Sequence, residues 1–275
     1  MTQDKYSAVW VSNSSINDFL NCPRLYYLRN VYKDPVTRHK INIINPSLAL
    51  GQTVHEVLEA LSTIPVAKRF ETSLLTTYDI VWEKVHGKLG GFTNKQEEQI
   101  IKERGLQMLQ KVIDNPGPLK NKAIKINQEL PNYYLSEEEN IILCGKIDWL
   151  EYIPEDNSVH IIDFKTGKND ESAFSLQLPI YLLLVNKLQS RKVSKASYWY
   201  LDRDNEPVLI QLPSPEEAYE KVLQTAKKVK EARLKREYQC KKGGCFACKP
   251  FEKIINQEAE LIGVSGYNQD LYMIS

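Results

Sequence analysis

The spacing of apolar side chains predicts helices in the first and last parts of the chain. Residues 14–33 and 51–62 carry apolar side chains at helical intervals, as expected of helices with one buried face. A longer helix is predicted after Asn94, and a last one is predicted to begin at Ser214 and run into Arg236. Both starts have a polar residue followed three positions later by glutamate, which is the pattern of a capping box.

The middle of the chain has the shorter apolar runs that are typical of strands. We expect strands at 122–134, 140–152, 158–165, 195–201 and 207–212. A helix is expected over 172–188, where Pro179 marks the first helical turn or kinks the helix. This order predicts an α/β fold in which a mixed sheet is flanked by helices.

Composition is that of a folded chain with no strong overall charge. The 275 residues are 42% hydrophobic and 26% charged, which suits one large domain with a packed core. The net charge is +1, so affinity for nucleic acid must come from uneven placement of charge. The first residues form no secretory signal, and the longest apolar stretch, 180–185, is too short to span a bilayer. We therefore expect a soluble, cytoplasmic protein.

Two carboxylates and a lysine end neighbouring apolar runs in the predicted sheet. Asp163 and Lys165 are two residues apart in one strand and so project to the same side, and a hairpin can bring Asp148 beside them. Converging carboxylates suit Mg²⁺ or Mn²⁺, and the ammonium can stabilise charge on a phosphate. The alternative is a surface hairpin with charged turn residues. A charge at the end of an apolar run is costly unless it has a partner, which favours the metal site.

Three further residues are weak signals when each is taken alone. His55 lies on the flank of an apolar helical stripe, where a histidine is more often a core or surface residue than a ligand. Gln177 and Tyr181 are four residues apart, so they share a helix face and can reach one site. A tyrosine among leucines is usually a core residue.

The order of these pieces is more specific than any one of them. The ordered motifs are Gly51-Gln-Thr-Val-His55, Gly145-Lys-Ile-Asp148, Ile162-Asp163-Phe-Lys165-Thr-Gly and Gln177-Leu-Pro-Ile-Tyr181. This series resembles the RecB-like branch of the PD-(D/E)XK nucleases and implies their restriction-endonuclease-like fold. The resemblance implies His55, Asp148, Asp163 and the Phe164 carbonyl as ligands of Mg²⁺ or Mn²⁺. It also implies Lys165 as the catalytic lysine and Gln177 and Tyr181 as the downstream site pair.

Five cysteines, at positions 22, 144, 240, 245 and 248, make a poor disulfide framework because their number is odd and three are crowded together. Cys245 and Cys248 form a Cys-x₂-Cys pair, a common grip for one metal centre. A fourth thiolate is needed beside Cys240 and this pair. Cys144 lies inside a predicted strand and is most simply a buried apolar residue, so Cys22 is the better candidate.

The family resemblance points to the same four cysteines. Several RecB-like nucleases, including AddB and the CRISPR adaptation nucleases, hold a 4Fe-4S cluster with one N-terminal and three C-terminal cysteines. In this chain the Cys-x₂-Cys pair comes last, which leaves zinc as an alternative to iron–sulfur. We expect a single nuclease domain over 1–275, with a catalytic core at about 48–213 and a cysteine staple formed by 14–33 and 214–255.

Two segments have the composition of a DNA-binding surface. Between Lys227 and Lys242 there are eight basic residues and two acidic ones, and the helix at 14–33 alternates arginines with tyrosines. Such segments suit phosphate contact and base stacking, although most charge runs are only solvated helix faces.

The function that the sequence favours is a metal-dependent DNA nuclease. We expect an exonuclease acting on single-stranded DNA or DNA ends in repair or recombination. The alternatives are a non-catalytic scaffold that binds nucleic acid and a zinc-stabilised RNA-processing factor. The sequence has no Gly-x₄-Gly-Lys-Ser/Thr phosphate-binding loop, so any unwinding requires a helicase partner.

Overall fold

The computed structural model describes residues 5–274 and divides into two compact units. The sheet unit comprises Pro46–Tyr133 and Gly145–Ala218. The cysteine unit comprises the described residues up to Asn45, Tyr134–Cys144, and the described residues from Tyr219 onward. The single-domain organisation expected from the sequence stays a prediction.

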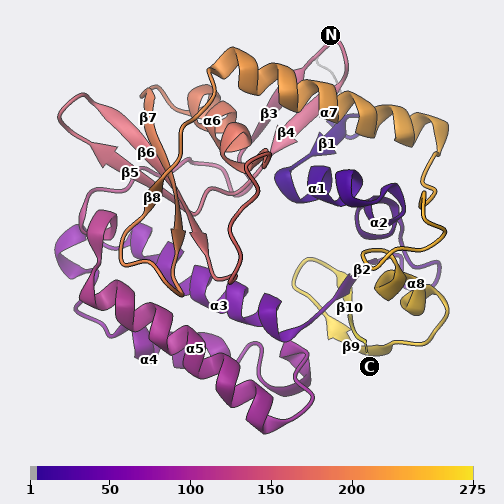
Figure 1. The fold of residues 1–275 in the computed structure, drawn as a ribbon, viewed down its shortest axis with the longest axis horizontal. Helices are drawn as coiled ribbons and strands as arrows, with labels where there is room; N and C mark the ends of the chain where they lie inside the picture. The colour runs from indigo at the N-terminus through magenta and orange to yellow at the C-terminus, as the bar shows by residue number, and fades with distance from the viewer. Residues whose placement is uncertain (1–4, 275) are drawn as a thin grey trace. The chain divides into compact units, whose positions relative to one another are not determined.

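A four-stranded mixed sheet forms the centre of the sheet unit (Figure 1). Its order is β5 (Trp149–Ile153), β6 (Ser158–Lys165), β7 (Val193–Tyr200) and β8 (Val208–Leu209). β5 is antiparallel to β6, β6 is parallel to β7, and β7 is antiparallel to β8. The mixed sheet predicted from the sequence is confirmed.

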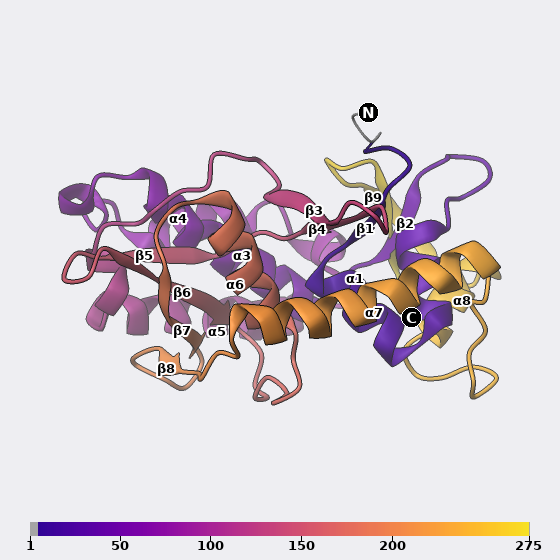
Figure 2. The same ribbon diagram turned by 90° about the horizontal axis from the view of Figure 1, so that it is seen from above.

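Helices cover both faces of this sheet. On one face lie α3 (Pro46–Ala60), α4 (Leu74–Trp82) and α5 (Lys95–Asp114), which contact one another (Figure 1). Their core includes Trp82 from the helices and Trp149 and Trp199 from the strands. On the other face α6 (Gln177–Leu188) contacts β6 and β7 (Figure 2). Short 3₁₀ turns lie at Leu61–Thr63, Val66–Lys68, Gly87–Gly90 and Gly117–Lys120.

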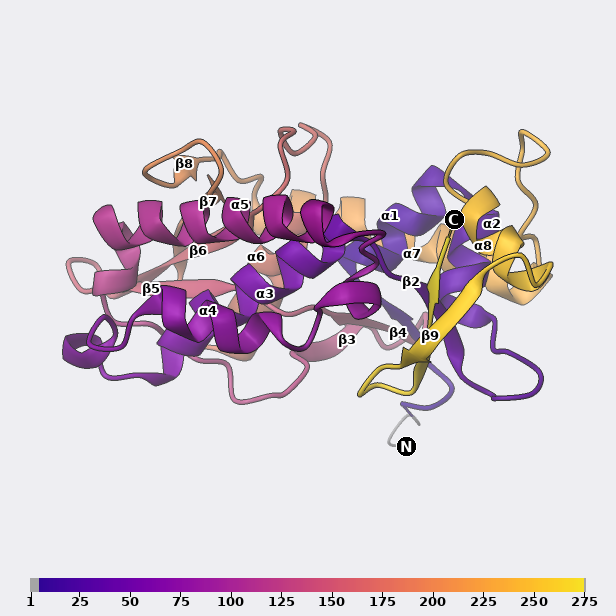
Figure 3. The same cartoon turned by 90° about the horizontal axis from the view of Figure 1, so that it is seen from below.

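The cysteine unit contains two three-stranded sheets. One has the order β1 (Val9–Val11), β4 (Ile141–Cys144) and β3 (Asn132–Ser136). The other has the order β2 (Lys40–Ile43), β10 (Gln269–Met273) and β9 (Glu260–Val264), and α8 (Lys249–Ile255) contacts β2 (Figure 3). The N-terminal helices are α1 (Asn13–Asn21), α2 (Pro23–Tyr26) and a π-helical turn at Tyr27–Val31. The helix α7 spans Pro215–Lys235, of which the part from Tyr219 onward belongs to the cysteine unit.

Several local predictions are confirmed. β6 has the bounds expected for the third strand, and Pro179 lies in the first turn of α6, where a missing N–H costs no helical hydrogen bond. Asn94 Oδ1 accepts a hydrogen bond from the Glu97 N–H at the start of α5. Ser214 and Glu217 exchange both hydrogen bonds of a capping box at the start of α7.

Several predicted elements differ in the structure. The strand expected at 207–212 is only Val208–Leu209, and the helix expected over 172–188 begins at Gln177. The expected strand 140–152 is two strands, because the chain leaves β4 at Gly145 and enters another sheet at Trp149. Most of 122–134 is irregular, with one bridge at Ala123. The expected helix 14–33 is interrupted at Cys22, because the residue before a proline avoids helical backbone angles.

Among the described residues, no helix is both long and apolar enough to cross a membrane.

Candidate active site and cysteine cluster

The β5–β6 hairpin brings Asp148 and Asp163 together at its open end. Trp149 pairs with Ile162, so the preceding Asp148 is directed to the position opposite Asp163. The backbone N–H of Phe164 donates a 2.9 Å hydrogen bond to Asp148 Oδ2. The hairpin expected from the sequence therefore forms, and a backbone contact holds its first carboxylate.

Asp163 and Lys165 project from β6 toward helix α6. Lys165 Nζ lies 2.9 Å from Asp163 Oδ2 and donates a 2.5 Å hydrogen bond to Gln177 Oε1. The Gln177 amide nitrogen donates to Asp163 Oδ1 at 2.6 Å and to the Tyr181 hydroxyl at 3.2 Å. The Gln177 side chain thus bridges the Asp163 carboxylate and the Lys165 ammonium. The four side chains expected from β6 and α6 are therefore in contact: Asp163, Lys165, Gln177 and Tyr181.

Helix α3 adds His55 to this group, together with a carboxylate that the sequence reasoning missed. His55 Nδ1 lies 3.3 Å from Asp148 Oδ2 and 3.8 Å from Oε1 of Glu59, one helical turn later. Ligand atoms of His55, Glu59 and Asp148 all lie within 4.8 Å of one another. The four-residue spacing from His55 is the sequence signal that could have indicated Glu59. Lys146 forms an ion pair with Glu59.

The electrostatics of the group suit a bound cation. Burial and repulsion from Asp148 raise the pKa of Asp163 to about 7. Burial acts to lower the pKa of His55, but Asp148, Glu59 and Asp163 together outweigh burial and raise that pKa to about 10. Asp163 Oδ2 is buried, and the Lys165 ammonium lies 2.9 Å from it. Carboxylate oxygens and an imidazole are ligands for Mg²⁺ or Mn²⁺, and a cation here would relieve the repulsion between the acids.

Lys165 remains an ammonium in this environment. Burial acts to lower the pKa of Lys165, but Asp163 and Glu171 outweigh it and hold the pKa above its ordinary value. Glu171 Oε2 lies 3.0 Å from Lys165 Nζ and is another residue that the sequence reasoning missed. The lysine can therefore supply positive charge to a phosphate but cannot accept a proton.

An arginine on α5 ties the ends of β6 and β7 together. Arg104 donates a 2.8 Å hydrogen bond to the carbonyl of Thr166, directly after Lys165. The same guanidinium binds both carboxylate oxygens of Asp202, at 3.1 and 3.0 Å. A two-bond arginine–carboxylate pair has a fixed geometry, so it restrains the strand end that carries Lys165. No motif in the sequence indicates Arg104.

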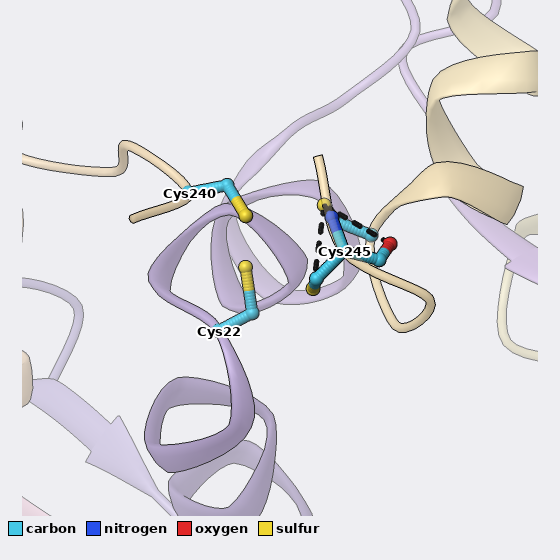
Figure 4. Close-up of side chains that lie close together, drawn as sticks. Cys22, Cys240 and Cys245 are labelled. Atoms are coloured by element: carbon cyan, nitrogen blue, oxygen red, sulfur yellow. Dashed lines mark hydrogen bonds between the residues drawn. The ribbon is translucent and has the colours of Figure 1, made fainter. Parts of the chain in front are cut away.

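Four cysteines form a separate cluster in the cysteine unit, and Figure 4 shows the side chains of Cys22, Cys240 and Cys245 turned toward one another. The sulfur atoms of these three and of Cys248 all lie within 4.8 Å of one another. Cys144 lies elsewhere, with its thiol 3.5 Å from the Val11 carbonyl. The structure therefore brings together the four cysteines selected from the sequence, and this group could bind a metal.

Two of these thiols are acidified and two are buried. The backbone N–H of Lys242 is the main cause that lowers the pKa of Cys240 to about 6, and the N–H of Cys248 lowers the pKa of Cys245. Burial raises the pKa of Cys22, and it raises the pKa of Cys248 to about 12. Thiolates are the metal-binding form, so a bound cation would favour release of the remaining protons.

The basic run 227–242 is partly neutralised by acids of the same unit. Lys227 and Lys230 both lie 2.8 Å from Glu139, and Lys235 pairs with Glu231. The remaining exposed cations of the run include Lys228, Arg236, Lys241 and Lys242. The net excess of charge that the sequence suggested is therefore smaller on the folded surface.

The stacking role expected for the N-terminal tyrosines is wrong for Tyr26. Its side chain is only 1% exposed and packs edge-on against Phe19. Arg24 instead pairs with Glu252, and Arg29 pairs with Asp18. Arg24 and Tyr26 contact segments more than two hundred residues away, whereas Arg29 contacts a residue of the same N-terminal segment.

A comparison with protein families adds an independent finding. A family model described as the PD-(D/E)XK nuclease superfamily matches residues 11–250. No curated protein gives a significant match. The matched range contains both carboxylates of the hairpin, Lys165 and α6, and agrees with the resemblance to the RecB-like branch. Nucleases of this superfamily use divalent metals, and the fold implies a DNA substrate. This chain therefore belongs to the PD-(D/E)XK superfamily of metal-dependent nucleases.

Proposed function

We propose that this chain is a RecB-like exonuclease that hydrolyses single-stranded DNA or DNA ends in repair or recombination. One observation carries the proposal: His55, Asp148, Asp163 and Lys165 converge at the open end of one hairpin, although α3, the hairpin and α6 are separated in sequence. A scaffold protein has no need to hold a buried carboxylate pair against a lysine, since such a group is costly to fold.

The residues have distinct roles in the proposed reaction. His55, Asp148, Asp163 and the carbonyl of Phe164 would hold Mg²⁺ or Mn²⁺. The bound cation would supply Lewis acidity and positive charge to the scissile phosphate. Water adds to phosphorus and one P–O bond breaks, which leaves a phosphate monoester on one product and a hydroxyl on the other.

Lys165 stabilises the charge that develops on the phosphate during this hydrolysis. Its ammonium is fixed by Asp163, at 2.9 Å, and by the amide oxygen of Gln177, at 2.5 Å. Preorganised charge of this kind lowers the activation barrier without reorganisation during the reaction. Gln177 is a positioning residue, and the hydroxyl of Tyr181 accepts one of its amide hydrogens.

The cysteine cluster is proposed to be a structural metal centre that ties the N-terminal and C-terminal segments of the cysteine unit together. The four sulfur atoms lie within 4.8 Å of one another. A zinc ion at about 2.3 Å from each thiolate would place the sulfurs about 3.8 Å apart, so this spacing is compatible with zinc. The family resemblance favours a 4Fe-4S cluster, which remains the expected occupant. A helicase partner is proposed for any reaction that begins on duplex DNA.

A cleavage assay on matched linear and circular single strands tests the proposed function. We expect the purified protein to degrade linear single-stranded DNA with Mg²⁺ or Mn²⁺, to spare the circle, and to stop in EDTA. Cleavage of the circle would replace the exonuclease with an endonuclease. Cleavage of RNA but not DNA would favour an RNA-processing factor, and no cleavage of any strand would favour a scaffold.

A further inference from the structure

The loop between β6 and α6 is anchored to the candidate active site at both ends. It begins after Lys165 and ends at Gln177, and both residues contact Asp163. Within the loop, Glu171 contacts Lys165 Nζ at 3.0 Å. Phe174 is three residues from Glu171 and three from Gln177. Three residues span at most about 11 Å, so the backbone of Phe174 lies close to these site residues.

The backbone around Phe174 is held in a defined turn. The Phe174 N–H donates to the Ser172 hydroxyl at 3.2 Å, and the Ser175 N–H donates to the Ser172 carbonyl at 2.9 Å. The Gln177 N–H then donates to the Ser175 hydroxyl at 3.3 Å. These bonds connect the turn directly to the start of α6. A side chain at Phe174 is therefore presented from a fixed backbone position.

The Phe174 ring itself is 93% exposed. Among the described residues of the sheet unit, it is the single aromatic side chain that is mostly exposed. A phenylalanine side chain stabilises a fold by being buried, so a ring this exposed adds almost nothing to folding here. The loop thus presents an apolar, planar group to solvent beside a site for phosphodiester hydrolysis.

We propose that Phe174 is a base-stacking residue that holds an unstacked nucleobase next to the scissile phosphate. This inference rests on the proposed function, because it requires DNA in the site. Stacking of a base on an aromatic ring contributes about 1–3 kcal/mol and tolerates any base, since every base has a π-face. Bases in a duplex already stack on their neighbours, so the ring selects single strands and frayed ends. The exposed Lys168 on the same loop adds positive charge.

Binding and cleavage measurements on Phe174→Ala test this role. We expect its Kd for single-stranded DNA in EDTA to rise by about 5- to 150-fold, the equivalent of one lost stacking contact. An abasic nucleotide beside the cleavage position should weaken binding to the wild type by a similar factor. The same abasic substrate should have no further effect on Phe174→Ala. Phe174→Trp should bind normally, and its added fluorescence should be quenched by the strand.

Tyr267→Ala is the matched control, because Tyr267 is also an exposed aromatic, at 84%, but lies in the turn between β9 and β10. Its Kd should equal that of the wild type. If wild-type protein cleaves single strands while Phe174→Ala shows an unchanged Kd and the same abasic penalty, the stacking role is wrong and the proposed function stands. If Phe174→Ala changes only the oligomeric state, the ring contacts a second copy of the chain instead. Failure of the wild type to cleave or bind any strand overturns both proposals.

Discussion

Asp163→Ala and Lys165→Ala are each expected to lower kcat by at least about 10²- to 10³-fold, because each removes preorganised charge from the transition state. Asp163→Ala should also weaken Mn²⁺ binding, since it removes an oxygen ligand, whereas Lys165→Ala should retain most of that binding. Single-turnover cleavage and Mn²⁺ titration of the same preparations measure both effects. Burial and Asp148 raise the pKa of Asp163, so its ionised form does not stabilise the metal-free fold. Asp163→Ala should therefore stay folded when no metal is bound.

The matched controls are Asp156→Ala and Lys192→Ala. These residues form an exposed ion pair of 3.1 Å in the same unit. Asp156 lies in the turn that closes the β5–β6 hairpin, at the opposite end from Asp148 and Asp163. Exposed pairs contribute little to stability, so both variants should cleave at the wild-type rate. Near-normal cleavage by Asp163→Ala or Lys165→Ala at saturating Mg²⁺ would overturn the assignment of these residues.

Cys22→Ser is expected to lose the metal centre and to lower Tm by roughly 10 °C or more. A structural metal site contributes on the order of 10 kcal/mol to folding, and each lost kcal/mol lowers Tm by about 2–4 °C in a chain of this size. Cys22 lies more than two hundred residues before Cys240, so a shared metal also removes much entropy from the unfolded chain. Anaerobic purification followed by iron, sulfide and zinc analysis and thermal unfolding measures both effects.

Cys144→Ser is the control for this experiment. Cys144 is buried outside the cluster, and its variant should retain the full metal content, with only the modest stability loss of a small buried change. We expect brown protein with bound iron and sulfide. Colourless protein with one zinc per chain would identify the metal as zinc instead of iron–sulfur, and the proposed structural metal centre would stand. Unchanged metal content in Cys22→Ser would show that Cys22 does not share a metal centre with the C-terminal cysteines.

The parts of the site that follow local rules could be predicted from the sequence. The two-residue period of a strand places Asp163 and Lys165 on one side, and the helical period places Gln177 and Tyr181 on one face. The ordered motifs then selected His55. These rules act over a few residues, so they do not depend on how distant segments pack.

The parts that depend on long-range packing could not be predicted. Nothing local marks Arg104, which acts through a partner ninety-eight residues away, Asp202. The expected strand 140–152 is interrupted at Gly145 because its two halves, β4 and β5, pair with strands of two different sheets. In the same way Tyr26 looked like a stacking residue, because the contacts that bury it come from distant segments of the chain. Whether a charged or aromatic side chain can contact a substrate therefore depends on contacts with residues that are distant in the sequence.

If His55, Asp148 and Asp163 hold a catalytic divalent cation, anomalous diffraction from crystals soaked in Mn²⁺ should locate it at these residues. We expect a manganese peak in contact with these three side chains, and loss of that peak in Asp163→Ala. The same data would show whether Glu59 also contacts the ion. A well-ordered hairpin with no manganese at these residues, or with manganese bound equally in Asp163→Ala, would show that these residues do not form the metal site.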